Sequence, residues 1–226
     1  MEEYSLRSQV FQTIRDDILK GKYEENDELR EATLGKELGV SRIPVREALR
    51  QLENEGLIEY VRNAGCSVKE ITLEESFEIY LMRANYETMA VKLMGGNVPE
   101  DTICRMEEVL EKMKKLDEEQ FDQVFVYDNQ MHGLLVEMTG MTRLYKAWKE
   151  LNYGNIVTGF SLSTDKKRVL ERQYPIHKEL VDACREKNKE KICHVLSEHY
   201  MRTIRRLLKE QGLSEEDSGF SFDFLV

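Results

Sequence analysis

The sequence GVSRIPVREALRQLENEGL, residues 39–57, decides how the N-terminal part of the chain folds. Its apolar residues recur at the i, i+3, i+4, i+7 spacing that forms one stripe along an α-helix. Ser41 is suited to cap the N-terminus of that helix, and Pro44 is tolerated in a first turn because no intrahelical N–H is needed there. Gly56 is suited to end the helix. The stretch therefore predicts a helix over 42–55 that begins after a tight bend.

The same helix carries a row of cations on another face. Arg42, Arg46 and Arg50 recur every four residues, and the first two lie near the N-terminal end. The preceding residues EATLGKEL predict a short helix, which the three-residue bend 39–41 joins to the second one. In a helix-turn-helix the second helix enters the major groove, where arginine donates to guanine O6 and N7 or to a phosphate. The pattern predicts a partner that is double-stranded operator DNA.

The flanking segments complete a winged helix-turn-helix. The apolar positions of a first helix, which stops near Gly21, are Leu6, Val10, Ile14 and Ile18. Downstream, the β-prone runs LIEYV and CSVKEI enclose RNAG, which predicts a hairpin wing with Gly65 at its tip. A plain helical hairpin with solvated arginines explains each arginine alone but not this order of elements. We expect the DNA-binding domain to cover residues 1–71.

The charge of the chain gives no support to DNA binding through bulk attraction. The net charge is −10, and residues 1–70 hold 11 Lys and Arg against 15 Asp and Glu, a balance of −4. A nucleic-acid binder usually presents a basic domain. Contact with DNA must therefore depend on the placement of a few cations, with the acids on other faces.

Composition also indicates the compartment. No apolar run approaches the roughly 20 residues that span a bilayer, and residues 1–20 carry acids rather than the basic start of a signal peptide. The four cysteines are scattered, at positions Cys66, Cys104, Cys184 and Cys193. We interpret them as reduced thiols. These features predict a cytoplasmic protein with no membrane partner.

The second half of the sequence predicts an all-α bundle. Helical patterns follow one another over 73–95, 99–116, 120–138, 141–162, 165–187 and 188–211. The breaks between them fall at turn-forming residues such as those in GGN and TG. The predicted fold class is therefore mostly α, with a winged helix-turn-helix followed by a six-helix bundle. We expect this bundle to cover residues 72–212 and to be followed by a tail, 213–226.

One group of side chains in the bundle has metal-ligand chemistry. Asp128 and His132 are four residues apart and share a helix face, and His177 and His199 lie in the last two helical patterns. If the four converge, they form a three-His, one-carboxylate site of the kind that bundles build. Such donors favour Zn²⁺ or Ni²⁺, with Mn²⁺ or Fe²⁺ possible. Spacing alone leaves open that these are ordinary helix histidines. His194 lies on a different face from His199 and is expected not to bind an ion.

The N-terminal motif VSRIPVREALRQLENEGLI resembles the signature of GntR-family winged-helix transcription factors, and the likeness covers residues 5–71. It implies that Arg42 and Arg46 contact bases in the major groove. It also implies that Arg30 and Ser41 contact phosphates or base edges and that Ile43 lies at the DNA interface. Gly65 would let the wing approach the minor groove. Ile43 replaces a residue that is often Thr in the family, which changes the expected operator sequence.

The bundle resembles the FCD (FadR C-terminal) ligand-binding domain of the FadR subfamily. The motifs that carry the likeness over 73–211 are RANYE, DNQMHGLLVEMTG and YPIHKELVDACREKNKEKICHVLSEHY. In metal-binding members the four corresponding positions hold a divalent ion. The resemblance thus implies that Asp128, His132, His177 and His199 hold one here. Met141 replaces the Asn that usually follows the TG turn.

The resemblance implies a homodimeric transcriptional regulator, more simply a repressor, rather than an enzyme. A small carboxylate effector would bind the ion, with Arg83 as a charge partner; an ion pair with Glu87 is the alternative role of Arg83. Two other functions remain open. In a metalloregulator the ion itself is the signal, and a metal-dependent hydrolase needs a general base near the ion. Glu137 and Glu198 are the nearby acids in sequence, but neither belongs to a catalytic motif.

Overall fold

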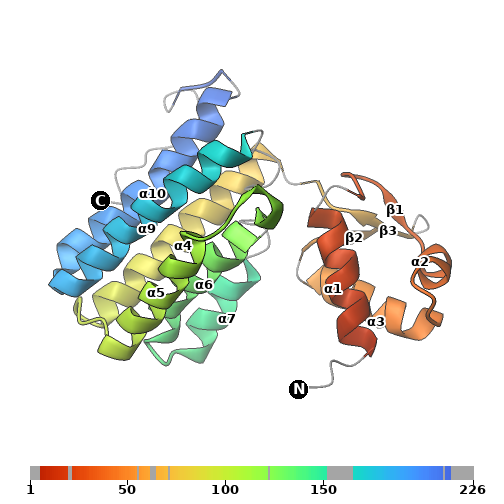
Figure 1. The fold of residues 1–226 in the computed structure, drawn as a ribbon, viewed down its shortest axis with the longest axis horizontal. Helices are drawn as coiled ribbons and strands as arrows, with labels where there is room; N and C mark the ends of the chain where they lie inside the picture. The colour runs from red at the N-terminus through yellow and green to blue at the C-terminus, as the bar shows by residue number, and fades with distance from the viewer. Residues whose placement is uncertain are drawn as a thin grey trace. The chain divides into compact units, whose positions relative to one another are not determined.

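The computed structural model describes residues 6–19, 22–54, 56–61, 65–70, 72–121, 123–151, 165–210 and 212–214. Contacts divide the chain into two compact units, residues 1–72 and 73–226 (Figure 1). Among the helices of the described ranges, none combines the length and the apolar character that a membrane crossing requires.

The first unit is a small winged helix. Its helices are α1 (Leu6–Leu19), α2 (Glu31–Glu37) and α3 (Arg42–Asn54), and its strands are β1 (Glu28–Leu29), β2 (Ile58–Val61) and β3 (Gly65–Val68). The strands form an antiparallel sheet in the order β1-β3-β2, and α3 packs against α1, α2 and β2. The stripe that predicted α3 is buried in this unit, at Val45, Ala48, Leu49 and Leu52.

The sequence missed one element of this unit. Strand β1 has two residues, too few for any alternation to show, and it exists because Leu29 pairs with Cys66 of β3. The wing is therefore part of a three-stranded sheet rather than an isolated hairpin. Gly65, predicted at the hairpin tip, lies instead in β3, where it pairs with Val61 of β2. Residues 62–64 lie outside the described part, as do residues 20–21, where the first helix was expected to stop.

The second unit is the helical bundle. Its helices are α4 (Leu73–Leu93), α5 (Glu100–Met113), α6 (Gln123–Glu137), α7 (Thr142–Glu150), α9 (Lys166–Glu186) and α10 (Lys189–Glu210), with a short 3-10 turn at Glu118–Gln120. Helix α10 packs along α4 and α9, α5 packs on α6 and α9, and α6 also contacts α4 and α7 (Figure 1). Each predicted helical pattern corresponds to one of these helices. Residues 152–162 of the fourth pattern and 215–226 of the tail lie outside the described part.

Among the described residues, the buried charged side chains of the bundle gather at one centre. Helix α5 buries one face through Ile103, Met106, Leu110 and Met113, which face α6 and α9. The buried polar and charged residues of α4, α6 and α9 include Arg83, Glu87, Asp128, His132 and His177. A buried charge is tolerated only when it is paired and hydrogen-bonded. These residues therefore form a polar centre whose members must pair with one another.

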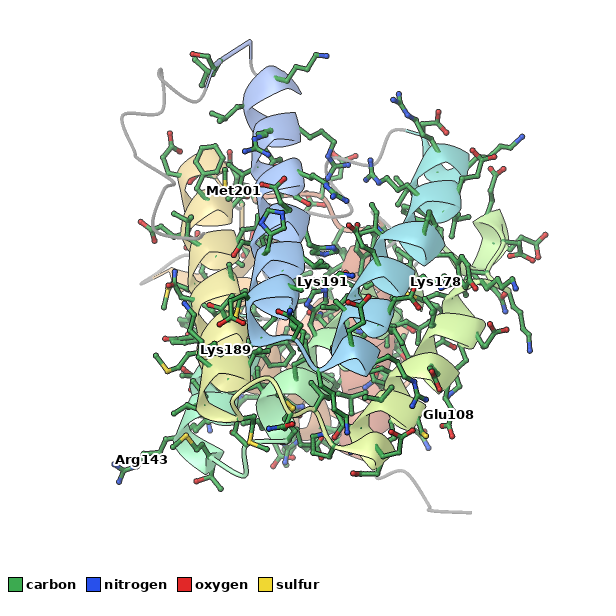
Figure 2. The ribbon with its side chains drawn as sticks, turned by 90° about the vertical axis from the view of Figure 1, so that its left-hand side faces the viewer. Glu108, Arg143, Lys178, Lys189, Lys191 and Met201 are labelled. Atoms are coloured by element: carbon green, nitrogen blue, oxygen red, sulfur yellow. The ribbon has the colours of Figure 1, made fainter. Side chains whose placement is uncertain are left out.

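The turn between α4 and α5 is held tightly against the start of α10. Gly96 has a φ of +79°, and a Cβ placed there would lie 2.7 Å from the backbone N of Lys189. Figure 2 labels Lys189 at this end of α10. A side chain at Gly96 would therefore both strain the backbone and push α10 away.

We expect Gly96→Ala to lower the free energy of unfolding by about 2–4 kcal/mol, because overpacking adds to the left-handed backbone strain. The measurement is urea unfolding followed by circular dichroism. Gly95→Ala is the matched control, since Gly95 has a φ of +61° and its added Cβ meets only the Asn97 side chain at 3.9 Å. It should lose about 1 kcal/mol. Equal losses in the two variants would mean that the contact with α10 contributes nothing.

Candidate functional site

The structure brings together the four side chains that the sequence singled out in the bundle. Asp128 and His132 of α6, His177 of α9 and His199 of α10 each offer one donor atom, and these atoms lie within 4.8 Å of one another. Opposed ligands of one ion are separated by roughly 4 Å, twice a metal–ligand bond. The four donors therefore lie within about 1 Å of the spacing that ligands of a single ion would have.

A buried carboxylate orients the ring of His132. Its Nδ1 lies 2.6 Å from Oε2 of Glu87, a residue of α4 that is fully buried. The other oxygen of Glu87 accepts from Trp148 Nε1 at 2.7 Å and from the Tyr200 hydroxyl at 2.6 Å. A carboxylate only accepts, so Nδ1 of His132 carries a proton, and in the neutral ring Nε2 presents its lone pair. That Nε2 is buried and has no hydrogen-bond partner among the described residues.

His177 is arranged in a similar way, whereas His199 differs. Nδ1 of His177 lies 2.8 Å from the carbonyl oxygen of Gln173, which also only accepts, so Nε2 again faces the cluster. That Nε2 lies 3.0 Å from Oδ1 of Asp128. In His199 the buried Nδ1 has no hydrogen-bond partner in the described part of the chain. Two buried ring nitrogens without hydrogen-bond partners among the described residues, in a cluster that holds one carboxylate, fit a cation better than a closed hydrogen-bond network.

The electrostatics of the cluster favour the metal-binding form of two of its donors, Asp128 and His199. Burial would raise the pKa of Asp128, but His132, His177 and His199 outweigh it and hold that pKa well below its usual range. Burial, with the neighbouring His132 and His177, holds the pKa of His199 well below its ordinary value. Burial also acts to lower the pKa of His132, yet Glu87 and Asp128 raise it overall. At neutral pH Asp128 is therefore ionised and His199 is neutral, as metal ligands must be.

Arg83 is a buried partner of this centre. Its Nε donates to the Tyr200 hydroxyl at 3.1 Å, and its Nη2 lies 3.9 Å from Glu87 and 4.0 Å from Asp128. Its guanidinium also lies 4.7 Å from the centre of the Trp148 ring. Arg83 thus has the ion pair with Glu87 that the sequence offered as its alternative role. It does not line the cavity beside the cluster, whose arginines are Arg172, Arg202 and Arg206.

The sequence did not indicate the supporting roles of Glu87, Trp148 and Tyr200. The spacing of Arg83 and Glu87 within RANYE signals an ion pair, but nothing in the sequence links that pair to an indole on α7. Glu137 and Glu198, the acids that lie near the ligands in sequence, are both in exposed ion pairs. Glu137 accepts from Arg105 at 3.1 Å, and Glu198 accepts from Arg205 at 3.2 Å.

A second candidate surface lies on the winged helix. A cleft of about 780 Å³ is lined by, among others, Arg30, Glu31, Arg42, Arg46, Tyr60 and Gly65. Arg46 forms a two-pronged ion pair with Glu31, with N–O distances of 2.6 and 2.8 Å, and Arg42 lies 3.5 Å from the same carboxylate. The hydrogen bond from Arg46 lowers the pKa of Glu31. Both arginines are thus held at the N-terminal end of α3 and remain largely exposed.

The remaining residues of the predicted DNA surface are exposed around this cleft. Ile43 is 67% exposed, which is unusual for an aliphatic side chain, and Ser41 is exposed immediately before α3. Arg30 forms a two-pronged ion pair with Glu28, at 2.7 Å for both bonds. Gly65 begins β3 with a φ of +98°, a conformation that favours glycine. The sequence missed Tyr60, which is exposed on β2 and lines the cleft.

Comparison with known families matches both units. Residues 6–68 match the family described as "Bacterial regulatory proteins, gntR family". Residues 78–202, more than half of the chain, match the FCD domain. The winged helix and the bundle therefore each correspond to one family.

Curated relatives and solved structures agree with this assignment. The HTH-type transcriptional regulator YdhC of Bacillus subtilis is 28% identical over 64% of this chain, and the alignment spans 65% of YdhC, just under two thirds. The probable D-xylose utilization operon transcriptional repressor of Paenarthrobacter nicotinovorans is 28% identical over 86% of this chain and 85% of its own. The structure of McbR from Escherichia coli superimposes with a TM-score of 0.72 at 22% identity, over 92% of this chain and 99% of McbR, which shows a shared fold.

Proposed function

The chain belongs to the gntR family of bacterial regulatory proteins and carries an FCD domain, and from this we propose that it is a transcriptional regulator that binds operator DNA as a homodimer. In this proposal residues 1–71 bind DNA, and 72–212 bind the effector and dimerise. The relatives named as repressors support repression as the sign of regulation. Such a regulator acts in the cytoplasm, where its operator lies, and no catalytic step is assigned to it.

The bundle of this regulator holds a divalent ion through Asp128, His132, His177 and His199. The observation that carries this proposal is that their four donor atoms lie within 4.8 Å of one another in an FCD domain. Zn²⁺ or Ni²⁺ suits three neutral imidazoles and a carboxylate best, with Mn²⁺ or Fe²⁺ as weaker candidates. When bound, the ion supplies a Lewis-acid position that a small carboxylate can occupy.

Binding of that carboxylate changes the affinity for DNA by shifting a population of conformations. A ligand has this effect only if it binds one state of the bundle more tightly than another. On the DNA side, Arg42 and Arg46 contact bases, Arg30 and Ser41 contact phosphates or base edges, and Gly65 lets the wing approach the minor groove. Ile43 packs on the DNA surface. Because operators of dimers have two-fold symmetry, we expect two half-sites about one helical turn apart.

The test combines elemental analysis and native mass spectrometry with DNA binding. We expect about one ion per chain and a small-acid adduct. Operator affinity, measured on DNA selected from a random pool, should change when the acid saturates the bundle. Operator affinity that follows the concentration of Zn²⁺ with no acid present would instead identify a metalloregulator. Unchanged affinity with the bundle saturated by acid and metal would refute regulation through this site.

We expect Glu87→Gln to weaken Zn²⁺ binding about 10- to 100-fold, the usual effect of losing a partner that orients a metal-binding histidine. An amide in place of the carboxylate no longer fixes the proton on Nδ1 of His132. The measurement is a competition titration with a chromogenic chelator. Glu78→Gln is the matched control on the same helix, since Glu78 is exposed. Equal Zn²⁺ affinities of the two variants would contradict the role of Glu87.

A further inference from the structure

A small cavity lies directly beside the His and Asp cluster. Its volume is about 110 Å³, and Asp128 and His199 form part of its lining. The rest of the lining comes from α4, α6, α9 and α10, including Tyr80. Pockets for drug-sized ligands usually measure about 300–1,000 Å³. A molecule that fits here therefore has a backbone of only a few carbon atoms.

Three arginines line the same cavity. Arg172 comes from α9, and Arg202 and Arg206 come from α10, one helical turn apart. Among the lining residues the single carboxylate is that of Asp128, which the three histidines already surround. The part of the cavity that lies away from the cluster is therefore rich in positive charge.

Arg202 has a partner that it can exchange for a ligand. Arg202 donates to Glu179 at 3.2 Å, in a pair whose two side chains are each about half exposed. Such pairs exchange readily with other partners because water screens them. Arg172 and Arg206 line the same cavity as Tyr80. Burial and Asp128 raise the pKa of the Tyr80 hydroxyl, and Arg206 and Arg172 act against that shift.

We infer that the effector is a small acid with two anionic groups, one at the His and Asp cluster and the other against Arg172, Arg202 and Arg206. This inference rests on the proposed function and narrows its ligand class. A monocarboxylate would satisfy the cluster and place an uncharged tail beside the three arginines of the lining. Guanidinium groups bind carboxylate and phosphate oxygens through paired N–H donors, so the second group can be either.

The test is calorimetric titration of the Zn²⁺-loaded full-length protein with matched acids. Malonate, succinate and glutarate are compared with propionate, butyrate and valerate, which have the same numbers of carbon atoms, and 3-phosphonopropionate tests a phosphonate as the second group. We expect at least one dianion to bind about 10-fold or more tightly than its monoanionic counterpart, as charge-assisted hydrogen bonds imply. Tighter binding of 3-phosphonopropionate than of succinate would assign the second group as a phosphate type.

Arg206→Gln provides the residue-level test. It should remove most of the preference for the dianion and leave both the affinity for the monoanion and the affinity for Zn²⁺ unchanged. Arg205→Gln is the matched control, because Arg205 is the adjacent residue on α10, pairs with Glu198 and is not among the residues that line the cavity. It should behave as the unmodified protein does.

The outcomes separate this inference from the function on which it rests. Equal binding of monoanions and dianions, with no effect of Arg206→Gln, would overturn the second anionic group and leave the metal-bound acid in place. Binding of Zn²⁺ without binding of any acid would overturn both the effector class and the proposed control by an acid. A preference for dianions that persists in Arg206→Gln and in Arg172→Gln would also overturn the inference.

Discussion

Replacing His199 by alanine is expected to abolish tight binding of Zn²⁺ to this protein, with a loss of affinity above about 100-fold, since even outer partners of a ligand contribute about 10- to 100-fold. His199 is the best ligand to remove because its side chain is partly exposed, whereas His132 and His177 are fully buried. Its loss should therefore disturb the core least. The measurement is a chelator competition titration, with circular dichroism as a check of folding.

His194→Ala is the matched control for this variant. His194 lies on the same helix, five residues earlier, and is exposed. The two variants remove the same side chain from α10, so a difference between them reports on the cluster rather than on the helix. Retention of tight Zn²⁺ binding by a folded His199→Ala protein would remove His199 from the ligand set.

The second large effect is expected at the DNA surface. Arg46→Ala should weaken binding to the operator by about 1–3 kcal/mol, the usual contribution of an arginine that contacts a guanine. The loss should be much smaller on unrelated DNA, because a base contact carries sequence information and a phosphate contact does not. The measurement is fluorescence anisotropy on both DNAs at one fixed salt concentration.

A control for the loss of one positive charge is available in the second unit. Arg143 on α7 is exposed and points away from the bundle (Figure 2), so Arg143→Ala removes a cation that belongs to no predicted DNA contact. It should leave both affinities unchanged. An equal loss on operator and unrelated DNA in Arg46→Ala would make Arg46 a phosphate contact.

The helices of this protein could be predicted from the sequence because their signals are local. Helix α3 has its apolar stripe, its Pro44 and its terminal Gly56 within one stretch, and the structure ends the helix at Asn54. Strand β1 has no such signal, because its two residues become a strand only by pairing with β3. The arginines of α3 could be predicted to be exposed, but not that Glu31 would hold Arg46, since that pair joins two elements 15 residues apart.

The candidate metal site also combines local features that the sequence predicts with long-range contacts that it does not predict. The spacing of Asp128 and His132 is a property of one helix and was visible in the sequence. Glu87 could not be predicted as the partner of His132, because the two residues are 45 positions apart and meet only when α4 packs on α6. The arginines of the cavity were missed for the same reason: nothing in the sequence distinguishes Arg206 from the exposed arginine beside it.

The hydrogen bond from Trp148 to Glu87 gives the protein an optical reporter. Trp148 is the only tryptophan of the chain, so its emission can be excited selectively. Its indole N–H shares the carboxylate with Nδ1 of His132, and the guanidinium of Arg83 lies over its ring. Any change in how strongly Nδ1 donates to Glu87 alters the electric field at the indole. The wavelength and quantum yield of its fluorescence should therefore follow occupancy of the centre in the unlabelled protein.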